Sequence, residues 1–192
     1  MLEEIRDRRY NEYALVLQKA FRKYNAIQYY LKLKNEAADL LYQKKERRNL
    51  SLNRKFYGDY IGLSNQPGLR ALIAKRENVE FAQSCYKYDR MFNKQKRDFI
   101  LTNRAIYIIG RDVVKDKNKN KSIIEVIKRR LEYPQLQKIV LSHLKDNFII
   151  IYPVNDYATV LEVEFKTEFL TTLSKRYKES CGKNVNIEFT DT

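Results

Sequence analysis

The chain is poor in the residues that build catalytic and metal centres. Its 192 residues include one histidine and two cysteines, Cys85 and Cys181, which lie far apart without metal-site spacing. We interpret both cysteines as reduced thiols of a cytosolic protein and His143 as a strand or turn residue. A P-loop, a G-x-S-x-G run and an H-E-x-x-H run are also missing. We therefore expect no catalytic residue, no metal and no cofactor.

Long apolar runs are missing as well. None approaches the roughly 20 residues that a membrane-spanning helix needs. The N-terminus, MLEEIRDRRYNEY, is too charged for a signal peptide. Aromatic residues, in contrast, are plentiful, with 15 tyrosines and 9 phenylalanines, which is enough to build a core. The length suits one domain plus an appendage, or two small domains.

Acidic residues are too few to balance the basic ones, and the net charge is +14. The stretch from Lys87 to Arg130 has 14 Lys and Arg against 5 Asp and Glu, a net of +9. Positive charge concentrated in this way indicates an anionic partner, either a membrane surface or a nucleic acid. A solvated face that only keeps the protein soluble is the alternative.

Residues 1–48 contain neither glycine nor proline. Apolar or small residues recur there at alternating steps of three and four, at Tyr10, Tyr13, Leu17, Ala20, Tyr24, Ile27 and Leu31. This spacing predicts one long amphipathic helix. Because such a helix gains little stability from propensity alone, its apolar stripe needs a cover. The cover is either the rest of the chain or another protein.

The middle of this segment, ALVLQKAFRKY from Ala14 to Tyr24, resembles an IQ motif, the helix that binds calmodulin and related light chains. Leu17, Gln18 and Arg22 match the motif, whereas Lys23 stands where Gly is usual and Ile27 where a second Arg is usual. The resemblance implies a calmodulin-like light chain as partner. Its contacts would be Leu17, Gln18, Phe21, Arg22, Lys23, Tyr24 and Ile27.

From Val79 onward the apolar residues form short runs typical of strands. Seven such runs lie at 79–88, 99–102, 105–109, 123–131, 139–141, 148–152 and 160–165. A helix follows over 169–177 and ends at Gly182, a short final strand covers Val185–Phe189, and Pro67–Arg76 favours a short helix before the strands. This order predicts an α+β fold. It combines a long N-terminal helix and extra flanking helices with a seven-stranded antiparallel barrel or sandwich and its C-terminal helix, like a pleckstrin homology domain.

From about Arg54 to Thr192 the chain resembles the tail homology 1 region of class I myosins. Six motifs carry the resemblance: FYGDYIGL at 56–63, KYDR at 87–90, KRDFILT at 96–102, IYIIGR at 106–111, FKTEF at 165–169 and FTDT at 189–192. An IQ-like helix directly upstream agrees with it. We therefore interpret 1–48 as a light-chain-binding neck and 49–192 as a tail region. The pleckstrin homology-like domain would cover about 79–182, and the actin-activated ATPase motor would precede residue 1.

The resemblance implies binding to acidic phospholipids, including phosphatidylserine and phosphatidylinositol bisphosphate. Lys87 and Arg97 match the family's head-group positions, and Gln95 stands where a further basic residue is usual. We expect a basic loop before Phe99, so that the head-group set is Lys87, Arg90, Lys94, Lys96 and Arg97. Auxiliary membrane contacts are expected from Met91, Phe92, Lys115, Lys117, Lys119, Lys121, Lys128, Arg129 and Arg130.

Two of these assignments have alternatives. Met91 and Phe92 either insert between lipids or pack into the core at a strand end. The charges of Lys128–Arg130 either contact the membrane or discourage edge pairing of a strand.

The function that these patterns favour is a non-catalytic membrane anchor, cytoplasmic and peripheral at the plasma membrane and the actin cortex. A nucleic-acid-binding basic domain and an actin-binding basic tail are the alternatives. No helix-turn-helix, zinc spacing or RNP-like run supports the nucleic-acid alternative, so we expect no nucleic-acid partner.

Overall fold

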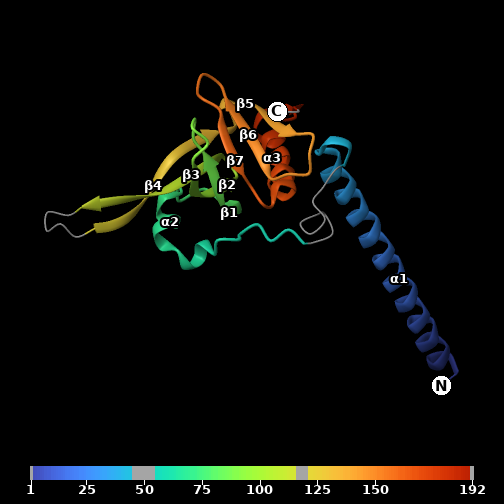
Figure 1. Cartoon of the computed structure of the whole chain (residues 1–192). Coiled ribbons are helices and arrows are strands. Elements are labelled where there is room, and N and C mark those ends of the chain that lie inside the picture. The colour runs from blue at the N-terminus through green and yellow to red at the C-terminus, as the bar shows by residue number, and fades with distance from the viewer. Residues whose placement is uncertain (1, 45–54, 116–120, 191–192) are drawn as a thin grey trace. The chain divides into compact units, whose positions relative to one another are not determined.

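The computed structural model describes residues 2–44, 55–115 and 121–190. They divide into two compact units, Met1–Glu36 and Ala37–Thr192. The first unit is most of helix α1 (Leu2–Asp39), and the second holds the remaining elements, most of which Figure 1 labels. No helix within the described residues is long and apolar enough to cross a bilayer.

Helix α1 confirms the helix expected from the glycine- and proline-free segment. It runs without interruption through 38 residues, with Glu3 and Glu4 in its first turn, where negative charge favours the helix dipole. A short 3-10 turn, η1 (Tyr42–Lys44), follows, and Gln43 has a left-handed backbone with φ of 48°. The helix was expected to continue to residue 48, but it ends at Asp39, because the chain leaves the helical path before the left-handed Gln43. Residues 45–48 lie outside the described residues.

The second unit is built on one eight-stranded sheet in the order β4-β3-β2-β1-β7-β6-β5-β8. Its strands are β1 (Val79–Tyr88), β2 (Lys94–Thr102), β3 (Ala105–Lys115), β4 (Lys121–Glu132), β5 (Leu136–Ser142), β6 (Phe148–Pro153), β7 (Thr159–Glu162) and β8 (Ile187–Thr190). The first seven are antiparallel to their neighbours, whereas β8 pairs in parallel with β5. Seven antiparallel strands, a helix and a final strand are the predicted order, and the pleckstrin homology-like architecture is confirmed.

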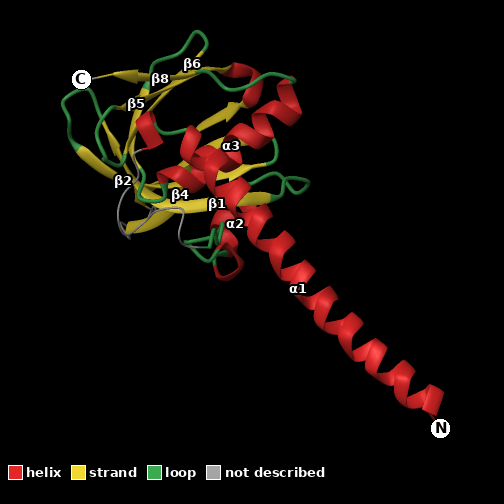
Figure 2. Ribbon diagram, turned by 90° about the vertical axis from the view of Figure 1, so that its right-hand side faces the viewer, coloured by secondary structure: helices red, strands yellow, loops and turns green. Residues whose placement is uncertain are grey.

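The main core lies between the strands and helix α3 (Lys166–Cys181), which is seen among them in Figure 2. The helix buries an apolar stripe against Phe81 and Phe99, and the stripe consists of Phe169, Leu170, Leu173 and Tyr177. Gly182 ends the helix with a φ of 69°, which confirms the predicted C-cap.

A second, smaller core covers the outer face of β1, β2 and β3. Helix α2 (Pro67–Leu72) and the 3-10 turn η2 (Leu63–Asn65) place Leu69 and Leu63 against Ala82, Ile100 and Ile109. The expected helix ran to Arg76, but α2 ends at Leu72 because the backbone of Ile73 is extended. A third 3-10 turn, η3 (Tyr133–Gln135), connects β4 to β5.

The FYGDY motif straps the segment before α2 onto the start of α3. The Glu168 carboxylate accepts hydrogen bonds from the Gly58 amide, at 2.7 Å, and from the Tyr60 hydroxyl. The Tyr60 ring stacks on Phe165 with centroids 3.8 Å apart. Gly58 has a φ of 76°, and a Cβ there would lie 2.8 Å from the Glu80 carbonyl oxygen, so only glycine fits. This motif therefore fixes the segment before α2 to the start of α3 and to β1.

Candidate functional site

The turn between β1 and β2 is organised by one aspartate. Asp89 Oδ1 accepts hydrogen bonds from the amides of Met91 and Asn93, both at 2.8 Å, and Oδ2 accepts from the Asn93 side chain at 2.9 Å. These hydrogen bonds, aided by the charge of Lys87, hold the pKa of Asp89 below its usual value. Phe92 adopts a left-handed backbone with φ of 59°. The turn therefore presents Arg90, Met91 and Phe92 to solvent.

Met91 and Phe92 are 84% and 80% exposed. The alternative in which they pack into the core at a strand end is therefore wrong. Their exposure is a consequence of the turn, because the Asp89 hydrogen bonds fold the chain back before either side chain reaches the sheet.

The expected basic loop before Phe99 is wrong, because Lys94, Lys96 and Arg97 lie within strand β2. The loop is instead the shorter turn between Tyr88 and Lys94. The three basic residues pair with β1 in the register Tyr88↔Lys94, Tyr86↔Lys96 and Cys85↔Arg97. Since side chains alternate along a strand, the basic residues separate onto two faces of the β1–β2 hairpin.

Lys87 and Arg97 lie on the inward face of this hairpin. Lys87 is paired with Gln95 on β2 and with the buried Leu161 on β7, and Arg97 is paired with the buried Cys85. The Lys87 ammonium lies 5.4 Å from the centroid of the Tyr157 ring. The two expected head-group residues thus share the face that continues into the core.

Arg97 lies over Gly110 of β3. A Cβ at Gly110 would be 3.1 Å from the Arg97 guanidinium carbon and 3.0 Å from Lys128, so the missing side chain makes room for both cations. The Arg97 guanidinium donates to the Gln95 side chain, while its Nε is buried and has no hydrogen-bond partner. Arg97 forms no ion pair with a carboxylate among the described residues, so its charge remains available to an anion.

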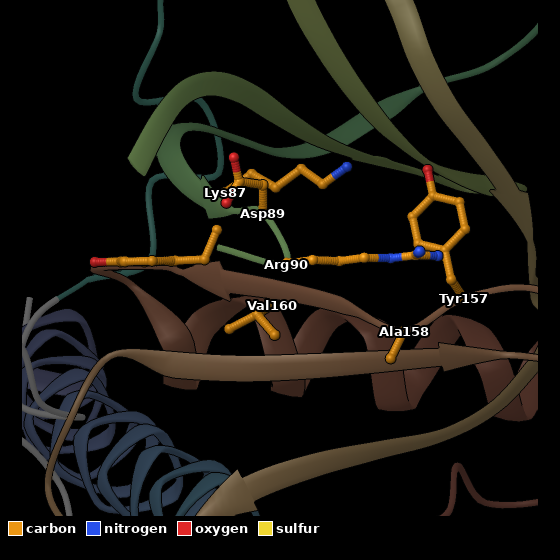
Figure 3. A pocket seen from close by; sticks show the side chains of 7 residues that line it. Lys87, Asp89, Arg90, Tyr157, Ala158 and Val160 are labelled. Atoms are coloured by element: carbon orange, nitrogen blue, oxygen red, sulfur yellow. The ribbon is translucent and has the colours of Figure 1, made fainter. Parts of the chain in front are cut away.

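An open cavity of about 390 Å³ adjoins this face. Lys87, Tyr88, Asp89 and Arg90 line it from β1 and the turn, and Tyr157, Ala158 and Val160 line it from the β6–β7 side. Figure 3 shows the Lys87 and Arg90 side chains both extending toward Tyr157. The cavity therefore brings together two of the expected head-group residues.

Lys94 and Lys96 lie on the opposite, outer face. Lys94 forms an ion pair of 2.8 Å with Glu162 and lies 4.0 Å from the centroid of the Tyr86 ring. Lys96 is exposed and has no described carboxylate within ion-pair distance. Lys87, Arg90 and Arg97 likewise have no carboxylate within ion-pair distance among the described residues.

The basic run on β4 is paired throughout. Lys128 contacts Asp112 at 2.6 Å, and Arg129 contacts Asp156 at 2.7 Å while its guanidinium carbon lies 3.8 Å from the centroid of the Tyr157 ring. Only 8% of the Arg129 side chain is exposed. Arg129 therefore joins β4 to the β6–β7 turn that lines the cavity.

Arg130 belongs to a buried network around Glu77. The Glu77 carboxylate accepts hydrogen bonds from Thr102 at 2.6 Å, Tyr107 at 3.0 Å and Arg130 at 3.1 Å. Burial would raise the pKa of Glu77, but these hydrogen bonds and the Arg130 charge together lower it. Arg130 also pairs with Glu132.

The lysines expected between β3 and β4 are described only in part. Lys115 ends β3 and Lys121 begins β4, and they are register partners. Lys117 and Lys119 lie outside the described residues.

Sequence reasoning missed the residues that complete the cavity from the other side, above all Tyr157. The turn residues just before it, Asn155 and Asp156, were visible in the sequence. Their position opposite Lys87 was not, because it depends on β7 pairing with β1 in the register Lys87↔Leu161.

The first unit presents the expected apolar light-chain residues with exposed side chains on α1. Leu17 is 70% exposed, Phe21 65%, Tyr24 59% and Ile27 47%. Leu15, Val16, Tyr29 and Leu33 lie off this stripe and are exposed as well. Apolar side chains therefore surround the helix on more than one face. Within the described parts of the chain, no three His, Cys, Asp or Glu residues cluster in a way that could hold a metal.

Residues 47–192 match the model of a protein family described as "Unconventional myosin tail, actin- and lipid-binding". The chain is 38% identical over 181 residues to the myosin ID heavy chain of Dictyostelium discoideum, a match that covers 92% of this chain. It is 36% identical over 198 residues to the myosin IC heavy chain of Acanthamoeba castellanii, with all of this chain covered. The chain spans 16% of the length of each of these relatives.

Among solved structures, the hSac2 domain of the human phosphoinositide phosphatase Sac2 is similar at a TM-score of 0.46 and 16% identity. That match covers 72% of this chain and 93% of the Sac2 domain.

Proposed function

Because this chain belongs to the class I unconventional myosin tails and is their non-catalytic tail homology 1 region, we propose that its sheet unit anchors the protein to acidic phospholipids. One observation carries the proposal. The cations around the β1–β2 hairpin divide into neutralised and available ones. Of the available ones, Lys87 and Arg90 line the open cavity, Arg97 lies on the same face of the hairpin as Lys87, and Lys96 lies on the outer face.

The energetics favour head-group binding over simple charge attraction. Each basic residue near an anionic leaflet contributes about 1 kcal/mol, so the four available cations supply about 4 kcal/mol, which alone gives weak attachment. Charge-assisted hydrogen bonds to a phosphate are stronger and more specific. The Lys87 ammonium and the Arg97 guanidinium lie on one face of the hairpin and are the donors for such bonds.

A phosphorylated inositol ring suits this cavity. Its volume of about 390 Å³ falls within the range of about 300–1,000 Å³ that is usual for small-ligand sites. Tyr157 lines the cavity beside Lys87 and supplies a neutral polar contact. We therefore propose phosphatidylinositol bisphosphate as the preferred lipid and phosphatidylserine as a weaker one.

The remaining expected contacts have different roles in this proposal. Met91 and Phe92 insert at the lipid interface, since both are exposed beside the available cations. Lys115, Lys117, Lys119 and Lys121 add long-range attraction. Lys128, Arg129 and Arg130 contribute less, because each is already paired with a carboxylate.

The experiment is co-sedimentation with vesicles at physiological salt. Three compositions are compared: neutral lipid, neutral lipid with phosphatidylserine, and the latter with a small fraction of phosphatidylinositol bisphosphate. We expect binding to need anionic lipid and to rise sharply with the bisphosphate. Absence of binding to all three compositions would overturn the proposal and favour a nucleic-acid or protein partner.

Helix α1 supports a second function, the binding of a calmodulin-like light chain. A two-lobed light chain covers a helix from more than one side, which agrees with apolar residues exposed around α1. Leu17→Asp should abolish co-purification of the light chain, because it places a charge in the stripe. Asn25→Asp adds the same charge away from the stripe and should weaken binding much less. A light chain retained by Leu17→Asp would contradict this binding mode.

Actin binding is carried by the family description, which names actin beside lipid. The net positive charge suits an acidic filament. Co-sedimentation of the chain with actin filaments at rising salt tests it. A protein that binds both acidic phospholipids and actin would be cytoplasmic and peripheral at the plasma membrane and its actin cortex.

A further inference from the structure

The hairpin of β3 and β4 continues beyond the rest of the sheet. β3 pairs with β2 only from Ile106↔Leu101 to Ile109↔Asp98, whereas β3 and β4 remain paired as far as Lys115↔Lys121. The outer part, Arg111–Lys115 with Lys121–Glu125, therefore has no third strand, and we name it the β3–β4 arm. Figure 1 shows this hairpin projecting past its neighbours.

The arm exposes β-branched apolar side chains on both of its faces. Val113 and Ile123 are direct cross-strand partners and are 61% and 69% exposed. Val114 and Ile124, whose side chains point to the opposite face, are 39% and 44% exposed. Two-stranded ribbons are marginally stable in water, and exposed strand edges usually carry charges that discourage association. Four exposed Val and Ile residues on such a ribbon therefore indicate a contact.

The arm extends from the end of the sheet that carries the available cations. β3 separates from β2 at Asp98, and β2 continues toward its first residue, Lys94, and the β1–β2 turn. Successive residues of β3 run in that same direction, so the arm and the exposed Met91 and Phe92 belong to one end of the sheet. At the base of the arm, Arg111 contacts Asp98 at 2.8 Å and thereby fixes the arm to β2.

We propose that the β3–β4 arm is a second apolar anchor that lies in the head-group region of an acidic bilayer. The proposal rests on the proposed lipid binding and adds residues that it does not use. Apolar side chains on both faces favour a bilayer, since lipid surrounds a ribbon whereas a protein groove covers one face. Lys115 and Lys121, the last register pair of the arm, add positive charge that complements an anionic leaflet.

The depth of the arm is limited by its backbone. The backbone groups of β3 and β4 hydrogen-bond to each other along their shared side. The outer sides of a two-stranded ribbon, however, have free N–H and C=O groups, which are too costly to place in hydrocarbon. The arm therefore lies at the head-group boundary, where amphipathic segments bury their apolar side chains to about 5–10 Å.

The absence of tryptophan from the chain allows a direct test. Ile123→Trp places a single indole on the arm, and Leu144→Trp places one at the exposed β5–β6 turn, at the other end of β6 from the cavity. Both proteins are mixed with phosphatidylserine and phosphatidylinositol bisphosphate vesicles, with and without brominated lipid. We expect a blue shift and bromine quenching for Ile123→Trp and neither change for Leu144→Trp.

A second variant measures the contribution to affinity. Val113→Ser combined with Ile123→Ser should weaken vesicle binding about tenfold, with no change in thermal unfolding, because both side chains are exposed. If the protein sediments with vesicles while the indole at 123 stays unquenched and the double variant binds normally, the arm is not an anchor and lipid binding stands. If nothing sediments, both proposals are overturned.

Discussion

The ammonium group of Lys94 on β2 lies 2.8 Å from the Glu162 carboxylate on β7, so that the pair spans the intervening strand β1. The Tyr88 hydroxyl donates to the same carboxylate at 2.9 Å. The hydrogen bond with Glu162 raises the pKa of Lys94, which remains charged but locally neutralised. Lys87, one strand away and on the other face, has no such partner among the described residues. Two lysines that look equivalent in sequence therefore differ in what they offer an anion.

This difference predicts unequal effects of alanine substitution. Lys87→Ala and Arg97→Ala should each weaken binding to bisphosphate-containing vesicles about fivefold, which corresponds to about 1 kcal/mol. Lys94→Ala should weaken it less than about twofold, because Glu162 already neutralises that charge. Vesicle co-sedimentation at constant salt measures all three. Lys138→Ala, which removes a cation of β5 that is paired with Glu188 of β8, controls for net charge. Equal losses for Lys94 and Lys87 would contradict the assignment.

The left-handed backbone of Phe92 predicts a separation of stability from binding. A bulky residue at a φ of 59° is strained, whereas glycine adopts this conformation freely. Phe92→Gly should therefore leave the thermal unfolding temperature unchanged or raise it, while vesicle binding falls. Calorimetry and co-sedimentation of the same preparation test both parts. Unchanged vesicle binding would show that the phenyl ring does not contact lipid.

The strap at Glu168 predicts a large loss of stability from a single substitution. Glu168→Ala removes the acceptor for the Gly58 amide and the Tyr60 hydroxyl. Since each buried hydrogen bond to a charged group contributes about 1.5–3 kcal/mol, we expect a loss of about 2–4 kcal/mol. Urea denaturation measures it. Glu164→Ala, at an exposed position four residues earlier, should change stability little, and a similar loss there would argue against the strap.

The buried network at Glu77 predicts a specific pH dependence. Because the pKa of Glu77 is lowered in the folded protein, its contribution to stability is present above its ordinary pKa of about 4.5 and is lost as the pH falls below it. Wild type should exceed Glu77→Gln in unfolding free energy by about 1–3 kcal/mol at pH 7, and the difference should shrink below about pH 4.5. Urea titrations between pH 7 and pH 3 measure this. A difference independent of pH would contradict the assigned ionised state.

The architecture could be predicted because its information is local. The long N-terminal helix, observed over Leu2–Asp39, follows from a segment without glycine or proline, and Gly182 is recognisable as a cap from its place after an apolar stripe. The order of seven strands and a helix follows from short apolar runs. Each of these elements can be recognised from consecutive residues, without knowing which distant segments they contact in the fold.

The site was predicted only in part, because it depends on pairing between distant segments. Lys94-Gln-Lys-Arg97 looks like a loop in sequence, yet β1 pairs with it and turns it into a strand. The alternation along that strand then places Arg97 inward and Lys96 outward. Tyr157 is brought opposite Lys87 by the pairing of β7 with β1, which no local pattern reveals.

The parallel pairing of β8 with β5 has a practical consequence for handling the protein. Thr190 lies beside Ser142, at the end of β5 that leads into the β5–β6 turn, and the cavity adjoins the turn at the other end of β6. An affinity tag fused after Thr192 would therefore attach away from Lys87 and Arg97. Immobilising the protein through that tag on a sensor chip should leave its cationic end facing the injected vesicles.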